Sequence, residues 1–482
     1  MIKTTTPPMT AFDIYQQQRR DHWDAVAAEF SQITGGRAYQ RRLAEVYRSL
    51  IPTGSRVLEI GCAAGDLLAA VEPAYGVGVD FSPGMIALAR SRYPNLHFIE
   101  ANAHNFHLDE TFDYVILSDL VNDLWDVQAA LANLAPMTTP RTRIILNSYS
   151  RLWEMPLKLA QRLRLAKPTL YQNWLTVEDI TNLLRLCDFE LIRHSQEVIY
   201  PLSTPIINPL ANRYLARLPI FKHLAVTNIY VARPVTPRLE EEKEPLISVI
   251  VPARNEAGNI EAIFQRTPEM GSGTELVFVE GHSRDNTYDA IEQAIAAHPE
   301  RRAQLHRQTG VGKGDAVRLG FEKATGDVLM ILDADLTVPP EDLPRFYDAL
   351  VSGKGEFING VRLVYPMEDE AMRFANLLGN KFFSYAFSWL LGQPIKDTLC
   401  GTKVLWKRDY ERIAANRAYF GDFDPFGDFD LLLGAARQSM KIVDIPIRYR
   451  QRTYGTTNIQ RWKHGLLLLR MVMFAARRIK FI

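Results

Sequence analysis

Short apolar runs that end in a polar or glycine-rich turn recur along the whole chain. Stretches with helical spacing separate them. The runs lie at 56–60, 76–80, 96–100, 113–117 and 143–147, and again at 246–253, 275–280 and 328–335. Strands that alternate with helices predict parallel sheets covered by helices on both faces. Both halves are therefore predicted to be α/β domains, with further helices before the first strand.

A change of composition separates the two halves at 234–245, PVTPRLEEEKEP. Prolines flank an acidic run there, which predicts an exposed linker. A charged loop inside one domain is the alternative, but the strand pattern begins anew on each side. We expect a first domain at 1–233, a second at 246–460, and a basic amphipathic helix at 461–482.

Composition sets limits on the class of protein. The chain has 482 residues, of which 47 % are hydrophobic and 23 % charged, as in ordinary folded proteins. The net charge of +1 indicates no nucleic-acid partner. Cys62, Cys187 and Cys400 lie too far apart for a CxxC metal site or a disulfide framework, which favours a reducing cytoplasm. No signal peptide or run of about 18 uncharged apolar residues is recognisable.

The first strand leads into a loop of small residues that suits a bound cofactor. Glu59, Gly61 and Gly65 belong to EIGCAAG, where small residues let the backbone approach a ligand. About twenty residues later, Asp80 ends the second strand, where a carboxylate can bind both hydroxyls of a ribose. The loop lacks the G-x-G-x-x-G spacing of a pyrophosphate cradle, which argues against a dinucleotide.

This half resembles the class I S-adenosylmethionine-dependent methyltransferases from about residue 20 to 233. The resemblance rests on VLEIGCAAGD, GVGVDFSPGMIALAR, FIEANAHNF and FDYVILSDLVNDLWD. It implies a Rossmann-like fold and S-adenosylmethionine as cofactor. The implied cofactor residues are Glu59, Gly61 and Gly65 at the methionine side, Asp80 at the ribose, and Asn102 and Ala103 at the adenine.

The motifs do not specify the methyl acceptor. Candidates for a general base follow the fourth strand or lie near it: Asp119, Asn122, Asp123 and His104. Helix capping or a solvated loop explains each of them singly better than a role as base does, so no base is assigned.

In the second half, an apolar strand leads into Asp333 and Asp335 in ILDADLTVPPEDL. Alternate residues of a strand point to the same side, and two carboxylates this close repel each other unless a cation intervenes. Oxygen ligands favour Mg²⁺ or Mn²⁺, which can bridge a diphosphate. An aspartate pair that caps the following turn is the alternative.

Three further motifs occur with this pair in a characteristic order. They are ISVIVPARNEAGNI (247–260), VFVEGHSRDNT (277–287) and GVGKGDAVRLGFEKATGD (310–327). Together they resemble inverting family 2 glycosyltransferases with the GT-A fold. The resemblance implies a nucleotide-sugar site of Pro252, Arg254, Glu256, Glu280, Lys313, Asp315, Asp333 and Asp335, with the metal on the last two. Glu280 and Gly281 depart from the family's usual VDDGSTDGT, which leaves the donor base open.

The segment 360–410 resembles the dolichyl-phosphate-mannose synthase branch, whose acceptor is a polyprenyl (dolichyl or undecaprenyl) phosphate. By that resemblance Arg362, Arg373 and Arg452 hold the acceptor phosphate, and Asp335, Asp397 and Arg362 are catalytic. Asp428 and Asp430 lie in the usual late acidic region and rank below Asp397.

The two resemblances imply a bifunctional enzyme. It would load a sugar onto a polyprenyl phosphate by metal-dependent, inverting transfer, and methylate a glycan or lipid-linked intermediate. One alternative has an active glycosyltransferase with an N-terminal S-adenosylmethionine-binding or scaffolding module, and another a sugar-binding domain that only recruits substrate. Apolar stretches with basic residues at 151–168, 208–225, 374–391 and 461–482 predict a peripheral protein at the inner face of the cell membrane.

Overall fold

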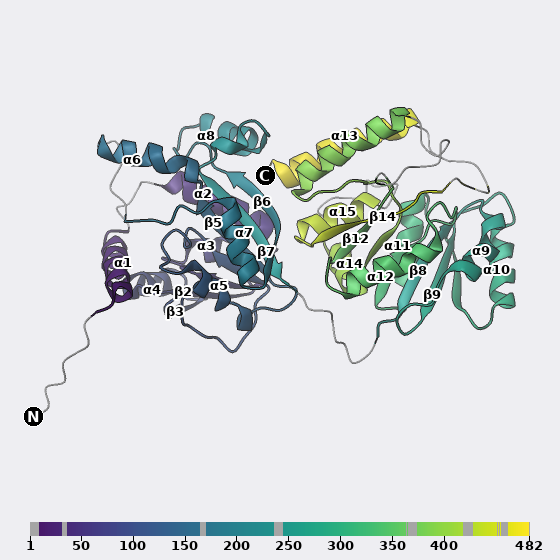
Figure 1. Cartoon of the computed structure of the whole chain (residues 1–482), viewed down its shortest axis with the longest axis horizontal. Helices are drawn as coiled ribbons and strands as arrows, with labels where there is room; N and C mark the ends of the chain where they lie inside the picture. Colours follow the sequence, from purple (N-terminus) through teal and green to yellow (C-terminus); the bar gives the residue numbers. More distant parts are fainter. Residues whose placement is uncertain are drawn as a thin grey trace, which may run out of the picture. The chain divides into compact units, whose positions relative to one another are not determined.

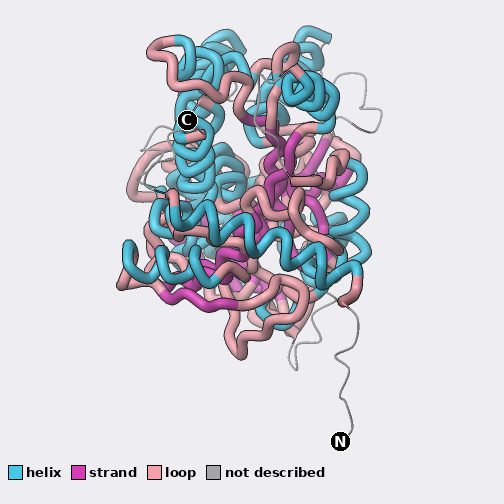
Figure 2. Tube along the Cα trace, turned by 90° about the vertical axis from the view of Figure 1, so that its left-hand side faces the viewer, coloured by secondary structure: helices cyan, strands magenta, loops and turns pink. Residues whose placement is uncertain are grey.

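The computed structural model describes residues 9–30, 36–163, 170–235, 244–362, 364, 374–417, 428–450, 452, 454 and 461–481. The chain forms two compact units (Figure 1). The N-terminal unit comprises Met1–Val235 with Phe481–Ile482, and the C-terminal unit comprises Thr236–Lys480. Strands form the interior and helices surround them (Figure 2).

The N-terminal unit contains one seven-stranded sheet and its covering helices. Its strands are β1 (Arg56–Ile60), β2 (Tyr75–Asp80), β3 (His97–Glu100), β4 (Tyr114–Leu117), β5 (Arg143–Tyr149), β6 (Phe189–Glu197) and β7 (Thr227–Pro234). Its helices are α1 (Ala11–Ala28), α2 (Arg37–Leu50), α3 (Asp66–Ala70), α4 (Pro83–Arg92), α5 (Val127–Ala132), α6 (Glu154–Arg162), α7 (Val177–Leu186) and α8 (Ile207–Pro209).

The strand order of this sheet is β3-β2-β1-β4-β5-β7-β6, and β7 runs antiparallel to both of its neighbours. Successive residues of a strand point to opposite faces of the sheet, and both faces of this sheet are buried. In β1, Leu58 and Ile60 pack into one hydrophobic cluster, whereas Val57 packs into another on the opposite face. Parallel strands bring the ends of β1, β2 and β4 to one edge, where the predicted cofactor residues lie.

The C-terminal unit contains a second seven-stranded sheet. Its strands are β8 (Ile247–Ala253), β9 (Thr274–Glu280), β10 (Arg302–Arg307), β11 (Val328–Ile331), β12 (Phe357–Val361), β13 (Lys403–Trp406) and β14 (Ile442–Pro446). Its helices are α9 (Ile260–Arg266), α10 (Thr287–Ala297), α11 (Lys313–Lys323), α12 (Leu343–Val351), α13 (Phe374–Leu391), α14 (Lys407–Ala415), α15 (Asp428–Arg437) and α16 (Arg461–Ala475).

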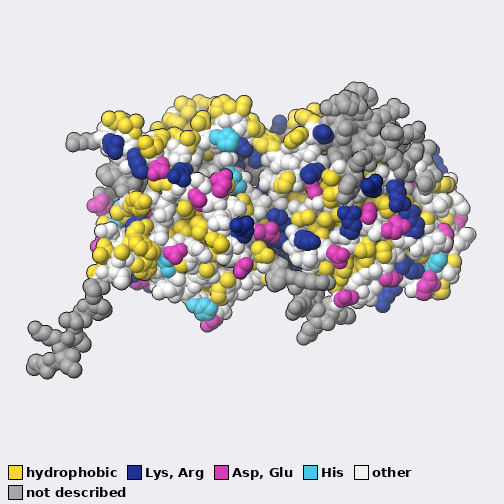
Figure 3. Space-filling view, viewed as in Figure 1, with side chains coloured by type: hydrophobic (Ala, Val, Ile, Leu, Met, Phe, Trp, Pro, Cys, Tyr) yellow, Lys and Arg dark blue, Asp and Glu magenta, His cyan; other side chains and the backbone are white. Residues whose placement is uncertain are grey.

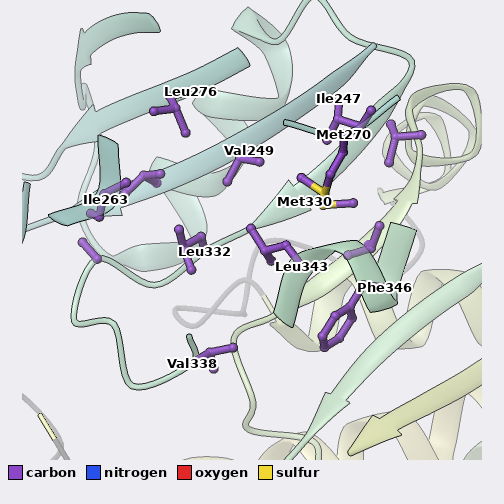
Figure 4. Close-up of a cluster of buried hydrophobic side chains, with 14 of the residues drawn as sticks. Ile247, Val249, Ile263, Met270, Leu276, Met330, Leu332, Val338, Leu343 and Phe346 are labelled. Atoms are coloured by element: carbon purple, nitrogen blue, oxygen red, sulfur yellow. The ribbon is translucent and has the colours of Figure 1, made fainter. Parts of the chain in front are cut away.

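The strand order here is β10-β9-β8-β11-β13-β12-β14, with β13 antiparallel to β11 and β12. Val249 and Met330 lie within the buried cluster of Figure 4, together with Phe346 of α12. On the opposite face α11 packs closely on β8, since a Cβ at Gly320 would lie 2.5 Å from Ile250 Cγ2.

One predicted strand is shorter than expected. The run 328–335 forms a strand only to Ile331, so Asp333 and Asp335 lie in the turn that follows it. The side chain of Asp335 accepts the backbone N–H of Thr337, a local hydrogen bond that competes with strand pairing. The two aspartates are therefore not presented side by side from a strand.

Candidate active sites

The turn after β1 requires glycine at two positions. Gly61 and Gly65 have φ of 74° and 79°, in the left-handed region that favours glycine. A Cβ at Gly65 would lie 2.8 Å from Phe98 Cζ, and one at Gly61 would lie 2.9 Å from Leu120 Cδ1. The backbone of this turn is thus held close to the sheet edge and open to a ligand.

Glu59 precedes this turn with an unsatisfied carboxylate oxygen. Its side chain is buried, and no hydrogen-bond partner is present for Oε2 among the described residues. Burial raises the pKa of the Glu59 carboxyl well above its ordinary value. A buried oxygen without a donor fits a cationic group such as the ammonium of an amino-acid tail.

Asp80 lies at the end of β2, beside the β1 turn. Its two carboxylate oxygens accept the backbone N–H groups of Ala63 and Ser82, both at 2.9 Å. Burial raises the pKa of the Asp80 carboxyl, and these N–H groups oppose the rise. Each oxygen retains a lone pair, so the carboxylate can also accept ribose hydroxyls.

Helix α1 crosses this edge, a feature that the sequence analysis missed. Gln16 Oε1 accepts Asn102 Nδ2 at 2.5 Å, and Asp24 Oδ1 accepts the hydroxyl of Ser82 at 2.5 Å and the N–H of Gly84 at 3.0 Å. Ala103, the other predicted adenine residue, is half-buried beside Asn102. The polar residues of α1 carry no motif, so their role emerges only from the fold.

The two aspartates in the turn after β11, Asp333 and Asp335, bind different partners. Asp333 Oδ1 lies 2.6 Å from Lys313 Nζ, while Asp335 accepts the Thr337 hydroxyl at 2.8 Å through Oδ1 and Arg452 Nη2 at 2.7 Å through Oδ2. Burial alone would raise the pKa of the Asp333 carboxyl, but Lys313 lowers it below its ordinary value. Each of the two carboxylates thus lies beside a cationic side chain.

Arg452 connects Asp335 to a second acid. Its Nη1 donates to Glu256 Oε1 at 2.9 Å, and Glu256 Oε2 accepts Asn259 Nδ2 at 2.9 Å. Burial raises the pKa of Glu256 to about 7, and the charge of Arg452 opposes this rise. One guanidinium therefore lies between two carboxylates that come from the ends of β8 and β11.

This pair of acids is the part of the site that fits a divalent cation. Among the described residues, no group of three or more His, Cys, Asp or Glu side chains could hold a metal alone. Mg²⁺ commonly uses one or two carboxylates and completes its shell with water and substrate phosphates. Asp335 and Glu256 provide such a pair, whereas Asp333 faces Lys313.

The loops after β8 and β9 are bonded to each other. Asn255 receives a hydrogen bond from the backbone of Arg284 at 2.7 Å and donates its own N–H to Ser283 Oγ at 3.0 Å. Glu280 accepts the N–H of Ser283 at 2.5 Å. Of the remaining predicted donor residues, Pro252 is the half-buried next-to-last residue of β8, Arg254 is exposed, and Asp315 accepts the N–H of Gly310 at 3.0 Å.

Asp397 and Arg362 lie together at the predicted acceptor side. Two hydrogen bonds of 2.7 and 2.9 Å join the carboxylate to the guanidinium. Burial alone would raise the pKa of Asp397, but Arg362 lowers it below its ordinary value. Arg362 also lies over the ring of Tyr449, 5.2 Å from its centroid, a contact that no sequence motif indicated.

Some predicted residues do not join these clusters. Arg373 lies outside the described residues, as does the side chain of Asp428. Asp430 is buried and pairs with Arg417 and Arg318 at 3.2 and 3.8 Å, an arrangement that explains its burial without a substrate. Lys403, which the sequence analysis overlooked, is fully buried in β13 and helps to lower the pKa of Asp333.

Comparisons with known proteins agree with the division of the chain into an N-terminal and a C-terminal unit. Residues 57–141 match the family model "Methyltransferase domain", and residues 248–413 match "Glycosyl transferase family 2". Part of the N-terminal unit thus matches a methyltransferase domain, and part of the C-terminal unit matches the family 2 glycosyltransferases; each match lies on one of the two seven-stranded α/β sheets.

Among curated relatives, a dolichol-phosphate mannosyltransferase of Pyrococcus furiosus is 29 % identical over 44 % of this chain and 59 % of its own length. An undecaprenyl-phosphate 4-deoxy-4-formamido-L-arabinose transferase of Shewanella sediminis is 34 % identical over 47 % of this chain and 64 % of its own length. The chain thus spans less than two thirds of the length of these relatives.

Two solved structures illustrate the similarity of each half. Glucosyl-3-phosphoglycerate synthase of Mycobacterium tuberculosis, in complex with Mn²⁺ and UDP, has a TM-score of 0.36 and 18 % identity over 49 % of this chain and 80 % of that one. An S-adenosylmethionine-dependent methyltransferase of Thermotoga maritima has a TM-score of 0.33 and 16 % identity over 46 % of this chain and 98 % of that one.

Proposed function

We propose that the C-terminal unit transfers a sugar from a nucleotide-sugar to a polyprenyl phosphate, with inversion at the anomeric carbon. The observation that carries the proposal is the joint arrangement of Glu256, Asp335 and Arg452 beside the Lys313–Asp333 pair. In this arrangement the acids can bind a divalent cation, and the positively charged side chains can bind a diphosphate at the same place. The names of the polyprenyl-phosphate relatives support this acceptor class.

Each part of the site then has a chemical task. A cation on Asp335 and Glu256 would neutralise the leaving diphosphate. Lys313 and Arg452 place positive charge beside that diphosphate, and positioning supplies most of the acceleration. An acceptor phosphate is already ionised near neutrality, so no strong base is needed. Asp397 instead orients Arg362, whose planar guanidinium can bind the acceptor phosphate.

Sugar transfer is tested with the purified full chain, Mn²⁺, undecaprenyl or dolichyl phosphate and a panel of nucleotide-sugars. Mass spectrometry should detect a sugar-bearing lipid phosphate, and Asp335→Ala should reduce it at least a hundredfold. Asp289→Asn, an exposed change at the start of α10, serves as the control and should not alter the rate. Equal activity of Asp335→Ala and the wild-type chain would contradict the proposal, and so would a wild-type chain without product.

The N-terminal unit is proposed to transfer a methyl group from S-adenosylmethionine to the same glycan or to a lipid-linked intermediate. The unsatisfied oxygen of Glu59, and the Asp80 carboxylate that accepts the backbone N–H of Ala63 at the β1 turn, support the cofactor. Calorimetry should show binding by the wild-type chain and at least tenfold weaker binding by Asp80→Ala. No binding by the wild-type chain would contradict a methyl-donor site, whereas binding without methyl transfer would favour a scaffolding module.

We further propose that the protein binds the inner surface of the cell membrane peripherally. Among the described residues, no helix is long and apolar enough to cross a bilayer. The N-terminal unit nevertheless exposes many large apolar side chains, gathered along the edge where α6 and α8 lie (Figure 3). This apolar surface comprises Leu152, Met155, Leu159, Leu163, Leu202, Ile206, Ile207, Leu210, Leu218, Ile220, Phe221 and Leu224.

The apolar surface of the N-terminal unit comes from two adjacent stretches, 151–163 and 202–224, that are rich in basic residues. Trp153 Nε1 donates to the backbone oxygen of Leu224 at 3.1 Å, which joins α6 to the later segment. The second stretch forms an irregular helical run over 207–217, which ends two residues before Pro219, and a further turn at Lys222–Leu224. Glu154 is the sole acid of 151–163 and 202–224, against six exposed or half-buried Arg and Lys residues: Arg151, Lys158, Arg162, Arg213, Arg217 and Lys222. Apolar side chains with basic neighbours suit an anionic bilayer.

A further inference from the structure

The acceptor side of the methyltransferase unit has four candidate bases, and hydrogen bonds distinguish them. His104 has both ring nitrogens engaged: Nδ1 lies 2.8 Å from Asn102 Oδ1, and Nε2 accepts the backbone N–H of Asp126 at 3.2 Å. Burial also lowers the pKa of His104. A ring fixed in this way has no free nitrogen for a substrate proton.

Two of the other candidates have structural roles. Asn122 is fully buried and accepts the N–H of Tyr149 at 3.3 Å, and an amide is no base at neutral pH. Asp123 lies 3.9 Å from Arg19, a guanidinium whose side chain is only 5 % exposed. Asp123 is the counter-charge of that buried cation, and protonating it would leave Arg19 without one.

Asp119 is the remaining candidate, and the fold fixes its carboxylate firmly. Its φ of 55° lies in the left-handed region, which is unusual for a residue other than glycine. Oδ1 accepts the Tyr39 hydroxyl at 2.8 Å and also Asn147 Nδ2. Tyr47 in turn donates to Asn147 Oδ1 at 2.7 Å. Hydrogen bonds from Tyr39 and Asn147 thus orient the Asp119 side chain, and the bond from Tyr47 orients Asn147 in turn. Asp119 itself is half-buried.

The same carboxylate lies next to the cofactor turn. Strands β1 and β4 are parallel neighbours, with Glu59 opposite Ile116, so the residues after β4 emerge at the edge that holds Gly61. Leu120, directly after Asp119, is the residue that a Cβ at Gly61 would meet at 2.9 Å. Asp119 therefore lies one residue from the contact with the methionine-side loop.

Aromatic rings surround this position. The ring of Tyr149 lies 6.4 Å from that of Tyr39 and 6.3 Å from that of Trp174. Tyr149 and Trp174 are half-buried, so parts of both rings remain accessible. Rings with polar tips beside a carboxylate suit a sugar, whose C–H faces pack on the rings while its hydroxyls form hydrogen bonds. Burial raises the pKa of Asp119 to about 6 although the bonds from Tyr39 and Asn147 oppose the rise.

We propose that Asp119 is the general base of an O-methyl transfer to a saccharide hydroxyl. The hydroxyl oxygen attacks the sulfonium methyl carbon, and the new C–O bond forms as the C–S bond breaks. The electron pair of that bond returns to sulfur, which leaves S-adenosylhomocysteine. The hydroxyl proton passes to the Asp119 carboxylate and then to water. This inference rests on the methyl transfer proposed above and names its acceptor class and base.

The test uses the full chain with deuterated-methyl S-adenosylmethionine and the sugar-lipids that it forms from undecaprenyl phosphate and a panel of nucleotide-sugars. We expect a labelled methyl ether that survives mild alkali. Its rate should rise with pH to a plateau above about 6 for the wild-type chain. Asp119→Asn should lower the rate about 10²–10⁴-fold and abolish this rise, while its affinity for S-adenosylmethionine stays within about threefold of wild type because the cofactor residues are unchanged.

Two further variants separate a base from a structural residue. Tyr39→Phe removes one hydrogen bond to the carboxylate and should move the midpoint of the pH profile upward. Asp126→Asn preserves an N-cap on the same edge and should leave the profile unchanged. A wild-type rate in Asp119→Asn, or an alkali-labile methyl ester, would overturn the inference and leave methyl transfer standing. A wild-type chain that binds the cofactor and methylates nothing would overturn both.

Discussion

Asp397 and Arg362 form a buried pair in which two carboxylate oxygens meet two guanidinium nitrogens. Nε lies 2.7 Å from Oδ2, Nη2 lies 2.9 Å from Oδ1, and the backbone N–H of Arg362 adds a third bond of 3.1 Å. The Arg362 side chain is 11 % exposed and the Asp397 side chain 1 %. The guanidinium plane is therefore fixed, and Asp397 binds Nε and Nη2 but not Nη1, whose N–H groups can point to the proposed acceptor phosphate.

Removal of the carboxylate charge should destabilise the C-terminal unit. Asp397→Asn leaves a buried guanidinium without its counter-charge, which costs about 3–5 kcal/mol of unfolding free energy. Denaturant unfolding of the C-terminal unit measures the loss. Asp342→Asn breaks a largely exposed pair with Arg345 and should change stability by less than about 0.5 kcal/mol. Equal stability of the two variants would show that the buried pair is energetically unimportant.

Arg452 should compete with a divalent cation for Glu256 and Asp335. Arg452→Gln removes the guanidinium from both acids, so the free chain should bind Mn²⁺ about tenfold more tightly, a difference of about 1.4 kcal/mol. The electron spin resonance signal of free Mn²⁺ measures this affinity. Arg345→Gln, a change at an exposed arginine outside this cluster, is the control. If both variants bind Mn²⁺ as the wild-type chain does, the two acids are not the cation site.

Gly65→Ala should weaken cofactor binding strongly. Alanine at this position would have a left-handed backbone conformation, and its Cβ would lie 2.8 Å from Phe98 Cζ, so either the aromatic ring or the turn must shift. We expect at least a tenfold loss of S-adenosylmethionine affinity by calorimetry. Gly54→Ala is a matched control, because its φ is also +80° but no atom lies within 4 Å of the added Cβ. Unchanged affinity in Gly65→Ala would separate this turn from the cofactor.

Membrane binding should depend on the apolar surface of the N-terminal unit. Met155→Glu with Ile206→Glu places charge at two positions that are 73 % and 79 % exposed, so folding should not suffer. Flotation with vesicles that contain anionic lipid should show at least a fivefold loss of bound protein, and salt should weaken binding by the wild-type chain. Val311→Glu, an equally exposed apolar change in the C-terminal unit, is the control. Unchanged flotation of the double variant would mean that another surface mediates binding.

Stability should also depend on pH through Asp119. Its pKa is about 6 in the folded chain against an ordinary 3.8, so the folded state retains this proton over a range in which the unfolded state has lost it. Wild-type stability should therefore fall relative to Asp119→Asn as pH rises from about 4 to about 6, and the difference should be constant above that range. Thermal unfolding of the N-terminal unit at several pH values measures this; a constant difference from pH 4 to 7 would contradict the raised pKa.

Much of both folds was predictable because their early strands are apolar runs that end at turns. β1, β2, β3, β4, β8 and β9 were expected within one residue of where they lie, and β5 ends two residues later than expected. β6 was missed because FELIRHSQE is neither an apolar run nor an alternating pattern, since its last five residues are all polar. The antiparallel β7 and β13 were also missed, since short apolar runs do not reveal strand direction.

Residue types at the sites were easier to predict than their partners. The sequence placed Asp333 and Asp335 together as ligands of one metal, whereas the structure directs one to Lys313 and the other to Arg452. The distinction depends on a turn after β11 and on Arg452, which lies 117 positions further along the chain. Such long-range pairing has no local signal.

The most direct measurement is mass spectrometry of the lipids formed by the full chain from undecaprenyl phosphate, Mn²⁺, a panel of nucleotide-sugars and deuterated-methyl S-adenosylmethionine. The proposed function predicts a sugar-bearing lipid phosphate that disappears with Asp335→Ala, and a labelled methyl group that disappears with Asp80→Ala. If no nucleotide-sugar yields a sugar on the lipid phosphate, or if Asp335→Ala forms it as readily as the wild-type chain, the account is contradicted.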